Sequence, residues 1–198
     1  MAWIDMVDEE KAEGKLAKLY DKLSRSGKNE VAHVLKVQSL NPDLLADHLK
    51  IYKTIMFASS NISRRQREMI ATVVSDVNEC HYWITHHGEA LQKLIRDDEQ
   101  ADKILNGILD DYKTAPISKK EKSMLDYAVK LTKKPASIKK DDLNQLREFD
   151  LSDRDILDLN QIVAYFNYVN RTADGLGIEL EANQKLEESG EVEVQNWF

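Results

Sequence analysis

The sequence predicts an all-α fold, a bundle of helices around an apolar core. Apolar residues recur at i, i+3 and i+4 along almost the whole chain, and no segment alternates convincingly with period two. Polar residues that start helices precede several of these stretches, and the 198 residues include only 7 glycines and 3 prolines. A chain of this length can bury about 70% of its unfolded surface without disulfides or metals. We therefore expect a single domain over residues 1–198.

The N-terminal part is expected to contain three helical segments. An apolar stripe indicates a first helix over residues 8–23, and residues 31–40 form a second apolar segment. Asn41 and Pro42 are typical of a helix start, with asparagine as the cap and proline at the first position. This third helix is expected to continue to Met56.

Further helix starts follow. Ser63 is expected to cap a helix, and the next helix is expected over residues 78–95. Three more caps precede periodic apolar stretches: Ser118, Asp141 and Ser152. The last helix is expected to end near Arg171, before an acidic and irregular tail over residues 179–198.

The chain contains a weak internal sequence repeat. At an offset of 89 residues, four positions recur: Ser63, Arg65, Val74 and Asn78 match Ser152, Arg154, Val163 and Asn167. This suggests a duplicated helical unit, with one copy over about residues 8–110 and the other over about 116–178. Cys80 and His87 occur only in the first copy, so we place the candidate chemistry there.

Composition and charge exclude several classes of protein. The formal net charge of −7 argues against bulk affinity for nucleic acid or anionic membranes. Residues 113–140 carry nine lysines against two acidic residues, which we interpret as a solvated helix face and loop. One cysteine cannot form an internal disulfide, and no stretch approaches the ~20 apolar residues of a membrane span. Because the N-terminus lacks the pattern of a signal peptide, we expect a cytoplasmic protein.

The densest group of reactive side chains contains Cys80 and His87. On a helix these residues share one face, separated by a rise of roughly 10 Å, so a bridging water or acid has to connect them. A helix that begins near Asn78 places Cys80 in its first turn, where the helix dipole favours a thiolate. Glu68 in the preceding helix can fold back toward this site. A carboxylate, a thiol and an imidazole together make a proton relay.

Each of these residues also has a structural interpretation. A single cysteine such as Cys80 is typical of a small buried hydrophobe, and Tyr82 and Trp83 are typical of core or interface aromatics. His81 and His86 lie about 140° apart around a helix, which does not favour a zinc site. We expect no metal and no cofactor.

Two polar residues near these elements are expected at helix ends. Glu79 is interpreted as an acid in the first turn of its helix, where the dipole favours it. Asn170 is interpreted as part of the turn that terminates the last helix.

Several segments resemble one known family. Residues 79–83 followed by His87 resemble the Cys-x-x-Cys-x-x-x-His segment of alkylhydroperoxidase D (AhpD)-like proteins in the carboxymuconolactone decarboxylase superfamily. The surrounding segments, residues 67–75 and 125–132, agree with this family. The C-terminal segments, residues 164–171 and 175–179, resemble its "peroxidase-related enzyme" branch. The resemblance extends over residues 8–181.

The resemblance implies an AhpD-like helical fold that assembles into trimers or hexamers of itself. It also implies an antioxidant thiol site in which Glu68, Cys80 and His87 match the family's acid, first cysteine and histidine. Tyr82, Trp83 and His86 are expected to line or support this pocket.

The sequence departs from the family pattern at Trp83, which stands where the family has its second cysteine. Without a second thiol, the usual dithiol cycle cannot run. A one-cysteine cycle remains, in which the Cys80 thiolate attacks a peroxide and an external thiol resolves the sulfenic acid.

Three functional hypotheses follow. The first is a single-cysteine peroxidase that uses Glu68, Cys80 and His87. The second is an acid–base enzyme without redox chemistry, in which Glu68 and His87 transfer protons on a small carboxylated ligand. The third is an oligomeric family member whose catalytic site has decayed.

Overall fold

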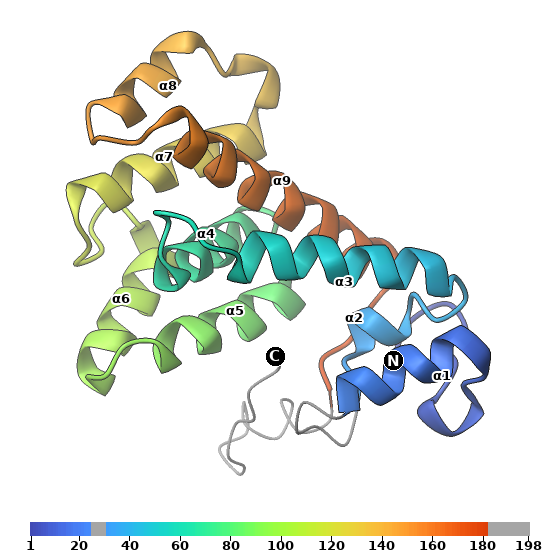
Figure 1. Ribbon diagram of the computed structural model, residues 1–198. Coiled ribbons are helices and arrows are strands. Elements are labelled where there is room, and N and C mark those ends of the chain that lie inside the picture. The colour runs from blue at the N-terminus through green and yellow to red at the C-terminus, as the bar shows by residue number, and fades with distance from the viewer. Residues whose placement is uncertain (25–30, 182–198) are drawn as a thin grey trace. The chain divides into compact units, whose positions relative to one another are not determined.

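The computed structural model describes residues 1–24 and 31–181, and all regular structure in this part of the chain is helical (Figure 1). The all-α prediction is therefore confirmed. The α-helices are α1 (Gly14–Ser24), α2 (His33–Lys36), α3 (Pro42–Phe57), α4 (Arg64–Val77), α5 (His81–Lys93), α6 (Asp98–Asp111), α7 (Lys119–Lys133), α8 (Lys140–Arg147) and α9 (Asp153–Gly175). Two short 3-10 turns are η1 (Glu9–Lys11) and η2 (Pro135–Ser137).

The chain folds into two compact units, and each is described by itself. Of the described residues, 1–24, 31–52 and 172–181 belong to one unit, and Lys53–Arg171 form the other. The halves suggested by the sequence repeat, 8–110 and 116–178, follow other boundaries. The interpretation of residues 1–198 as one domain stays a prediction.

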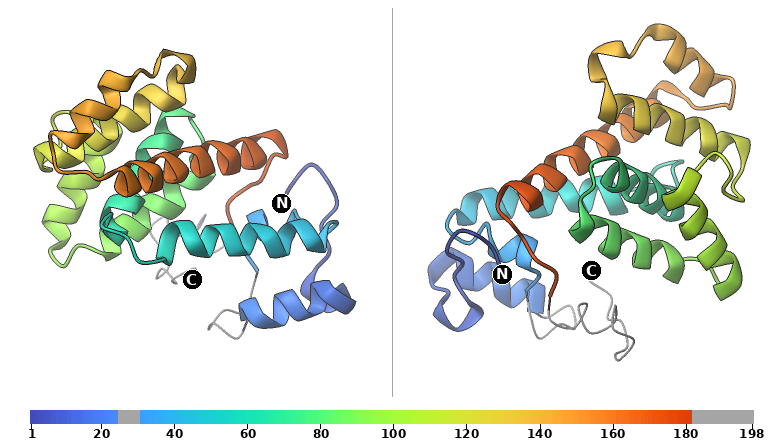
Figure 2. Two further views of the ribbon diagram at one scale, coloured as in Figure 1. Left: turned by 45° about the horizontal axis from the view of Figure 1, so that its top comes forward. Right: turned by 180° about the vertical axis from the view of Figure 1, so that it is seen from behind.

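Helix α4 is the central helix of the second unit. It packs against α5, α6 and α7, and α8 packs on α7 (Figures 1 and 2). Nine consecutive residues of α4, Arg67 to Ser75, are buried, and because nine residues exceed two helical turns, this part of α4 is buried on all sides. Glu68 lies within this buried run, so the fold places a carboxylate inside the core.

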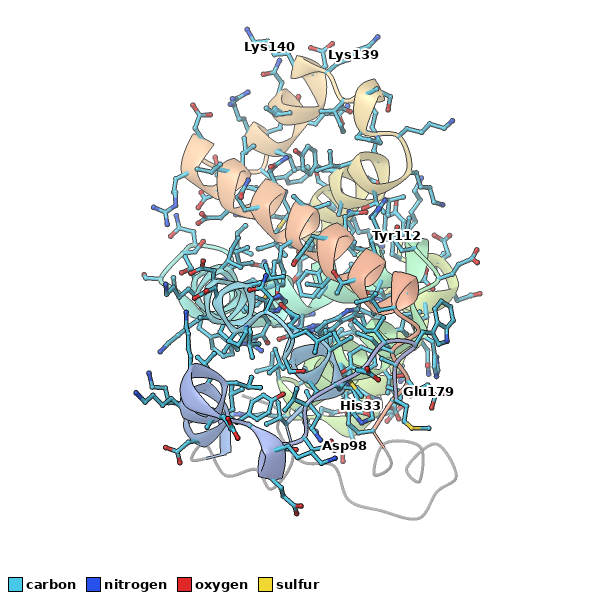
Figure 3. All side chains as sticks on the ribbon, turned by 90° about the vertical axis from the view of Figure 1, so that its right-hand side faces the viewer. His33, Asp98, Tyr112, Lys139, Lys140 and Glu179 are labelled. Atoms are coloured by element: carbon cyan, nitrogen blue, oxygen red, sulfur yellow. The ribbon has the colours of Figure 1, made fainter. Side chains whose placement is uncertain are left out.

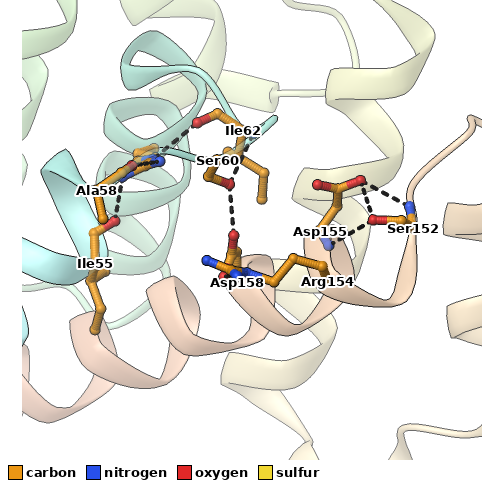
Figure 4. Close-up of polar contacts among 9 residues, drawn as sticks. Ile55, Ala58, Ser60, Ile62, Ser152, Arg154, Asp155 and Asp158 are labelled. Carbon is orange, nitrogen blue, oxygen red and sulfur yellow. Dashed lines mark hydrogen bonds and ion pairs between the residues drawn. The ribbon is translucent and has the colours of Figure 1, made fainter.

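The three predicted serine caps are confirmed, as is the predicted cap Asn41 at the start of α3. Ser63 accepts a hydrogen bond from the backbone N–H of Gln66, whose side chain accepts one from the Ser63 N–H in return. Ser118 closes the same reciprocal arrangement at the start of α7. At the start of α9, Ser152 Oγ accepts from the Asp155 N–H at 3.2 Å and the Asp155 carboxylate accepts from the Ser152 N–H (Figure 4). Each pair satisfies two backbone donors that a helix start leaves open.

The predicted helix over residues 8–23 is wrong in its first half. A short turn, η1, occupies the beginning, and α1 starts only at Gly14. The physical reason is the backbone of Gly14, whose φ of +55° is incompatible with continuous right-handed helix. In residues 31–40 only His33–Lys36 is α-helical, because turns closed by bonds to the third residue back follow it.

Two expectations farther along the chain also need correction. Asp141 is not the cap of α8, because Lys139 occupies that position and its N–H donates to the Asp142 carboxylate at 2.7 Å. Helix α6 was not predicted. Its signal was present in the sequence, since Asp97 accepts from the Gln100 N–H at 2.8 Å as a helix cap.

The start of the predicted tail is ordered within the first unit. His33 and Glu179 lie side by side in Figure 3, where the His33 Nδ1–H donates to the Glu179 carbonyl oxygen at 2.7 Å. The buried Glu181 carboxylate accepts from the His33 backbone N–H at 2.7 Å. The rest of the predicted irregular tail, residues 182–198, lies outside the described residues.

Within the second unit, the lysine-rich stretch is solvated at Lys139 and Lys140, which are exposed and extend away from the ribbon (Figure 3). Among the described residues, no helix is both long and apolar enough to cross a membrane.

Candidate functional site

A buried carboxylate–imidazole pair forms the centre of the candidate site. Glu68 on α4 and His87 on α5 are joined by a hydrogen bond from Nδ1 of His87 to Oε2 of Glu68. The two residues are 0% and 4% exposed. The structure thus brings together two of the three residues that the sequence suggested as catalytic, because α4 and α5 fold back on one another.

Arg64 is a third member that sequence reasoning missed. Its Nε and Nη2 donate to Oε1 of Glu68 at 2.6 and 2.5 Å, so the guanidinium and the imidazole occupy different oxygens of one carboxylate. The guanidinium also lies over the ring of Phe57, 3.9 Å from its centroid. The available signal was the spacing of four between Arg64 and Glu68, which places them on one helix face.

These contacts determine the charge of Glu68. Burial alone raises the pKa of a carboxyl group, but His87 and Arg64 outweigh burial here and hold the pKa of Glu68 below its usual value. Glu68 is therefore ionised at neutral pH inside the core.

Aromatic rings enclose the imidazole of His87. The Trp83 ring stacks on it, with centroids 5.2 Å apart and an interplanar angle of 21°. Phe166 of α9 meets it edge-on, with centroids 4.6 Å apart. The Nε2 atom of His87 is buried and has no hydrogen-bond partner among the described residues. Buried polar atoms in native proteins nearly always have a hydrogen-bond partner. Because Nε2 has none within the described chain, it is available to pair with a ligand or a water.

Trp83 is held in place from two sides. Its Nε1–H donates to the carbonyl oxygen of Val169 at 3.1 Å. The Tyr82 ring meets it edge-on at 5.2 Å between centroids, and His86 lies 4.4 Å from the Tyr82 ring. Tyr82, Trp83 and His86 thus form an aromatic group around the pair. Tyr82 and Trp83 are buried, whereas His86 is partly exposed.

The segment before Cys80 differs from the prediction. Asn78 ends α4 rather than starting α5, and Glu79 adopts a left-handed conformation with φ of 57°. The N–H groups of Glu79 and Cys80 donate to Asp76 and Ser75 carbonyl oxygens, both at 2.9 Å. This is the hydrogen-bond pattern of a Schellman motif. Glu79 is therefore a helix-ending residue, and Cys80 is the N-cap of α5 rather than part of its first turn.

The thiol of Cys80 is fully buried and faces α9. Its Sγ donates to the carbonyl oxygen of Asn170 at 3.9 Å, a bond that a thiol can make and a thiolate cannot. Seven residues separate Cys80 from His87, a rise of roughly 10 Å along the helix. A direct thiol–imidazole bond is thus not the arrangement that connects them.

Asn170 has another role than the one predicted. Because α9 continues to Gly175, Asn170 lies inside the helix and is fully buried. Its Oδ1 accepts from Asn78 at 2.8 Å and its Nδ2 donates to Ser75 Oγ at 3.1 Å. Asn170 thus ties the turn that presents Cys80 to α9.

Chemically, the site can hold and move a proton. Glu68 fixes the Nδ1–H of His87, so that Nε2 can accept or donate a proton within an apolar enclosure. In the part of the chain that is described, no three His, Cys, Asp or Glu side chains gather as metal ligands.

Comparison with known proteins points to one family. The sequence profile of the carboxymuconolactone decarboxylase family matches residues 42–115, which include Glu68, Cys80 and His87. A peroxidase-related protein from Silicibacter sp. TM1040 is 30% identical, with a TM-score of 0.80 over 91% of this chain and 92% of the other. No curated protein sequence matches this chain significantly.

Two more distant structures share the fold. A peroxidase-related protein with an AhpD core from Ralstonia eutropha JMP134 is 22% identical, with a TM-score of 0.81 over 93% of this chain and 95% of the other. The debrominase Bmp8, solved in complex with 2,3,4-tribromopyrrole, is 15% identical, with a TM-score of 0.75 over 96% of this chain and 99% of the other. At these identities the likeness concerns the fold alone.

Proposed function

The chain belongs to the carboxymuconolactone decarboxylase/alkylhydroperoxidase D superfamily, and from this membership and the site geometry we propose that it reduces peroxides through the single thiol of Cys80. The observation that carries the proposal is the buried hydrogen bond between Glu68 and His87, which leaves Nε2 of His87 without a partner among the described residues. An imidazole held in this way can accept and donate a proton.

The first half of the cycle consumes the peroxide. Nε2 of His87 takes the proton of Cys80 through a bridging water, because the two groups are too far apart for direct contact. The thiolate attacks one peroxide oxygen, the O–O bond breaks, and the proton returns from His87 to the departing oxygen. The products are a sulfenic acid at Cys80 and an alcohol, or water if the substrate is hydrogen peroxide.

The second half restores the thiol and needs an external reductant. One thiol molecule condenses with the sulfenic acid to give a mixed disulfide and water. A second thiol attacks that disulfide, which releases Cys80 and the oxidised reductant. A low-molecular-weight thiol or a protein thiol supplies both equivalents, since Cys80 is the only cysteine of the chain.

The test is peroxide consumption with hydrogen peroxide or cumene hydroperoxide and dithiothreitol as the reductant. Cys80→Ser should abolish turnover, and His87→Asn should slow it about 100-fold or more. Arg154→Gln, which removes an exposed arginine from α9, is the control and should retain the wild-type rate. Wild-type protein should also form a dimedone adduct at Cys80 after peroxide treatment, detected by mass spectrometry. Unchanged turnover in Cys80→Ser would end the proposal.

A second candidate function is acid–base catalysis without redox chemistry, on a small carboxylated ligand. The observation that favours it is that the Glu68–His87 pair is complete without Cys80, whose thiol donates to Asn170 instead. In that case Cys80→Ser would retain nearly the wild-type activity, whereas His87→Asn would remove it. The same two variants therefore separate the two functions.

A further inference from the structure

We propose that Asn170 is a positioning residue that controls access to the thiol of Cys80: its side chain holds the turn between α4 and α5 against α9, and breaking these hydrogen bonds exposes the thiol. The inference rests on the proposed function in one respect, namely that Cys80 has to react with an external thiol. The contacts that hold the turn do not depend on that function.

The proposed cycle requires the site to open, because Cys80 is 0% exposed. In thiol–disulfide exchange the attacking sulfur has to reach the sulfur that it attacks. An external thiol cannot reach an atom that solvent does not touch. The structure therefore describes a closed state that protects the thiol, and the reactive state is one in which the turn has moved away from α9.

Asn170 holds the turn through both polar atoms of its side chain. Its Oδ1 accepts from Nδ2 of Asn78 at 2.8 Å, and its Nδ2 donates to Oγ of Ser75 at 3.1 Å. Ser75 belongs to the last turn of α4, and Asn78 directly follows this helix. Asn170 and Ser75 are both fully buried, so in the closed state no water replaces a bond that is lost.

The same two buried residues also contact Cys80 from two sides. The carbonyl oxygen of Ser75 accepts from the Cys80 N–H at 2.9 Å, and the carbonyl oxygen of Asn170 accepts from Sγ at 3.9 Å. The side-chain bond between Asn170 and Ser75 thus closes a ring of hydrogen bonds around Cys80. Because one side chain completes this ring, a substitution of Asn170 acts on the surroundings of the thiol without removing Glu68 or His87.

Only a short segment has to move. Glu79, directly before Cys80, is exposed, and residues 76–78 are half-buried. The left-handed conformation of Glu79, with φ of 57°, is unfavourable for a residue other than glycine, so opening the turn relieves strain. The first turn of α5 has its own contact with α9, since the Nε1–H of Trp83 donates to the carbonyl oxygen of Val169. The opening is therefore local to the turn.

The chain contains a matched control for Asn170. Asn160 lies on the same helix, and its Nδ2 donates to the hydroxyl oxygen of Tyr127 at 2.9 Å, which joins α9 to α7 rather than to the turn. Asn160→Ala removes a side chain of the same size and a hydrogen bond between helices. A general weakening of the packing of α9 therefore appears in both variants, whereas an effect on the turn appears only in Asn170→Ala.

The experiment measures the rate at which N-ethylmaleimide labels Cys80 in the full chain, followed by mass spectrometry at urea concentrations below the unfolding transition. The label reports this residue alone, because it is the single cysteine of the chain. In the wild type the rate should be slow and nearly independent of urea, since a local opening exposes little surface. Asn170→Ala should raise the rate about 10-fold or more, because it removes two buried hydrogen bonds. Asn160→Ala should leave the rate unchanged.

Equal labelling rates in the wild type and Asn170→Ala would overturn the inference, and so would the same acceleration in Asn160→Ala. A wild-type rate that rises with urea as steeply as the unfolded fraction would also overturn it, because the thiol would then be exposed only by global unfolding. If Asn170→Ala does not fold, Asn78→Ala removes the bond to Oδ1 from the other side and should accelerate labelling. An unchanged rate in that variant would overturn the inference equally. Failure of the proposed function would instead appear as absent peroxide turnover in protein whose labelling follows the prediction.

Discussion

At the scale of single residues, the site depends on a carboxylate that is buried and yet ionised. Glu68 is tolerated in the core because Arg64 and His87 saturate its two oxygens. Removing one partner of such a buried group usually costs several kcal/mol, since the charge is then left uncompensated. The same contacts orient the imidazole, so the stability of the core and the geometry of the candidate site depend on the same hydrogen bonds.

A second buried histidine gives a prediction on pH. Burial lowers the pKa of His48 on α3 from 6.5 to about 4. The unfolded chain therefore binds this proton more readily than the folded chain does. Because the folded chain resists protonation of His48, the contribution of His48 to the free energy of unfolding is highest above pH 6.5. It falls by about 3 kcal/mol in total as the pH falls toward 4.

Urea unfolding measures this effect. Because of His48, the free energy of unfolding of the wild type should fall by about 2 kcal/mol between pH 7.5 and pH 5. His48→Gln should lack this part of the pH dependence, whereas His81→Gln, at an exposed position of α5, should retain it. Identical pH dependence in wild type and His48→Gln would contradict the prediction.

At the scale of elements, the turn between α4 and α5 is the feature that presents the thiol. It contains a left-handed residue, Glu79, immediately before Cys80. Asp150, which precedes α9, has the same conformation with φ of 59°, and its N–H and that of Leu151 make the matching bonds back to α8. Two helix-ending turns of one type thus lead into α5 and α9. Neither has the glycine that such a position favours.

Glu79→Gly should therefore stabilise the protein by about 1 kcal/mol, because glycine adopts the left-handed conformation without a steric cost. Asp150→Gly is the matched variant and should stabilise it similarly, with no effect on the site. Urea unfolding measures both. A lower unfolding midpoint in Glu79→Gly would show that the glutamate side chain compensates for its backbone.

The packing of α6 gives a second prediction at this scale. A Cβ at Gly107 would lie 2.9 Å from both Cα and Cβ of Ala115, closer than real side chains approach. Gly107→Ala should cost about 1–3 kcal/mol, since backbone must move to make room. Gly175→Ala meets no atom within 4 Å and is the control, with a gain of about 0.5–1 kcal/mol. Thermal unfolding of the two variants should shift in opposite directions, and equal shifts would refute the packing argument.

At the scale of the whole molecule, the internal repeat acquires a physical meaning. Asn78 and Asn167, which match at the offset of 89 residues, are hydrogen-bonded to each other, with Nδ2 of Asn78 donating to Oδ1 of Asn167 at 3.2 Å. Asn78 follows the last residue of α4 and Asn167 lies inside α9, so two positions that match in the sequence are in direct contact in the folded chain.

Assembly of the protein is the prediction that belongs to this scale. The family resemblance implies trimers or hexamers, so sedimentation equilibrium should give three or six times the chain mass of 22.8 kDa. Leu157 and Tyr168 lie on one face of α9, and they are 54% and 45% exposed in the single chain. Burial of apolar residues of this kind drives association. A mass of one chain at micromolar concentration would contradict the prediction.

The sequence alone was sufficient for the features that depend on neighbouring residues. The all-α class, the caps Ser63, Ser118 and Ser152, and the placement of Glu68 one helix before His87 all follow from spacings of a few residues. Hydrophobic periodicity and capping are local, which is why they can be recognised without knowing the fold. Where a local signal was overlooked, as at Asp97 and Gln100, an element was missed.

The environment of the site depended on contacts between residues that lie far apart in the chain. Phe166 against His87, Asn170 against Cys80 and Val169 against Trp83 each join α9 to α5 across about 80 to 90 residues. No pattern of spacing encodes such a pair, because it exists only once α9 packs against the α4–α5 turn and α5 itself. That packing leaves Nε2 of His87 without a partner among the described residues, and it directs the thiol of Cys80 to a carbonyl oxygen of α9. The sequence therefore supplied the reactive groups, whereas the packing of the helices determined which of their atoms are available.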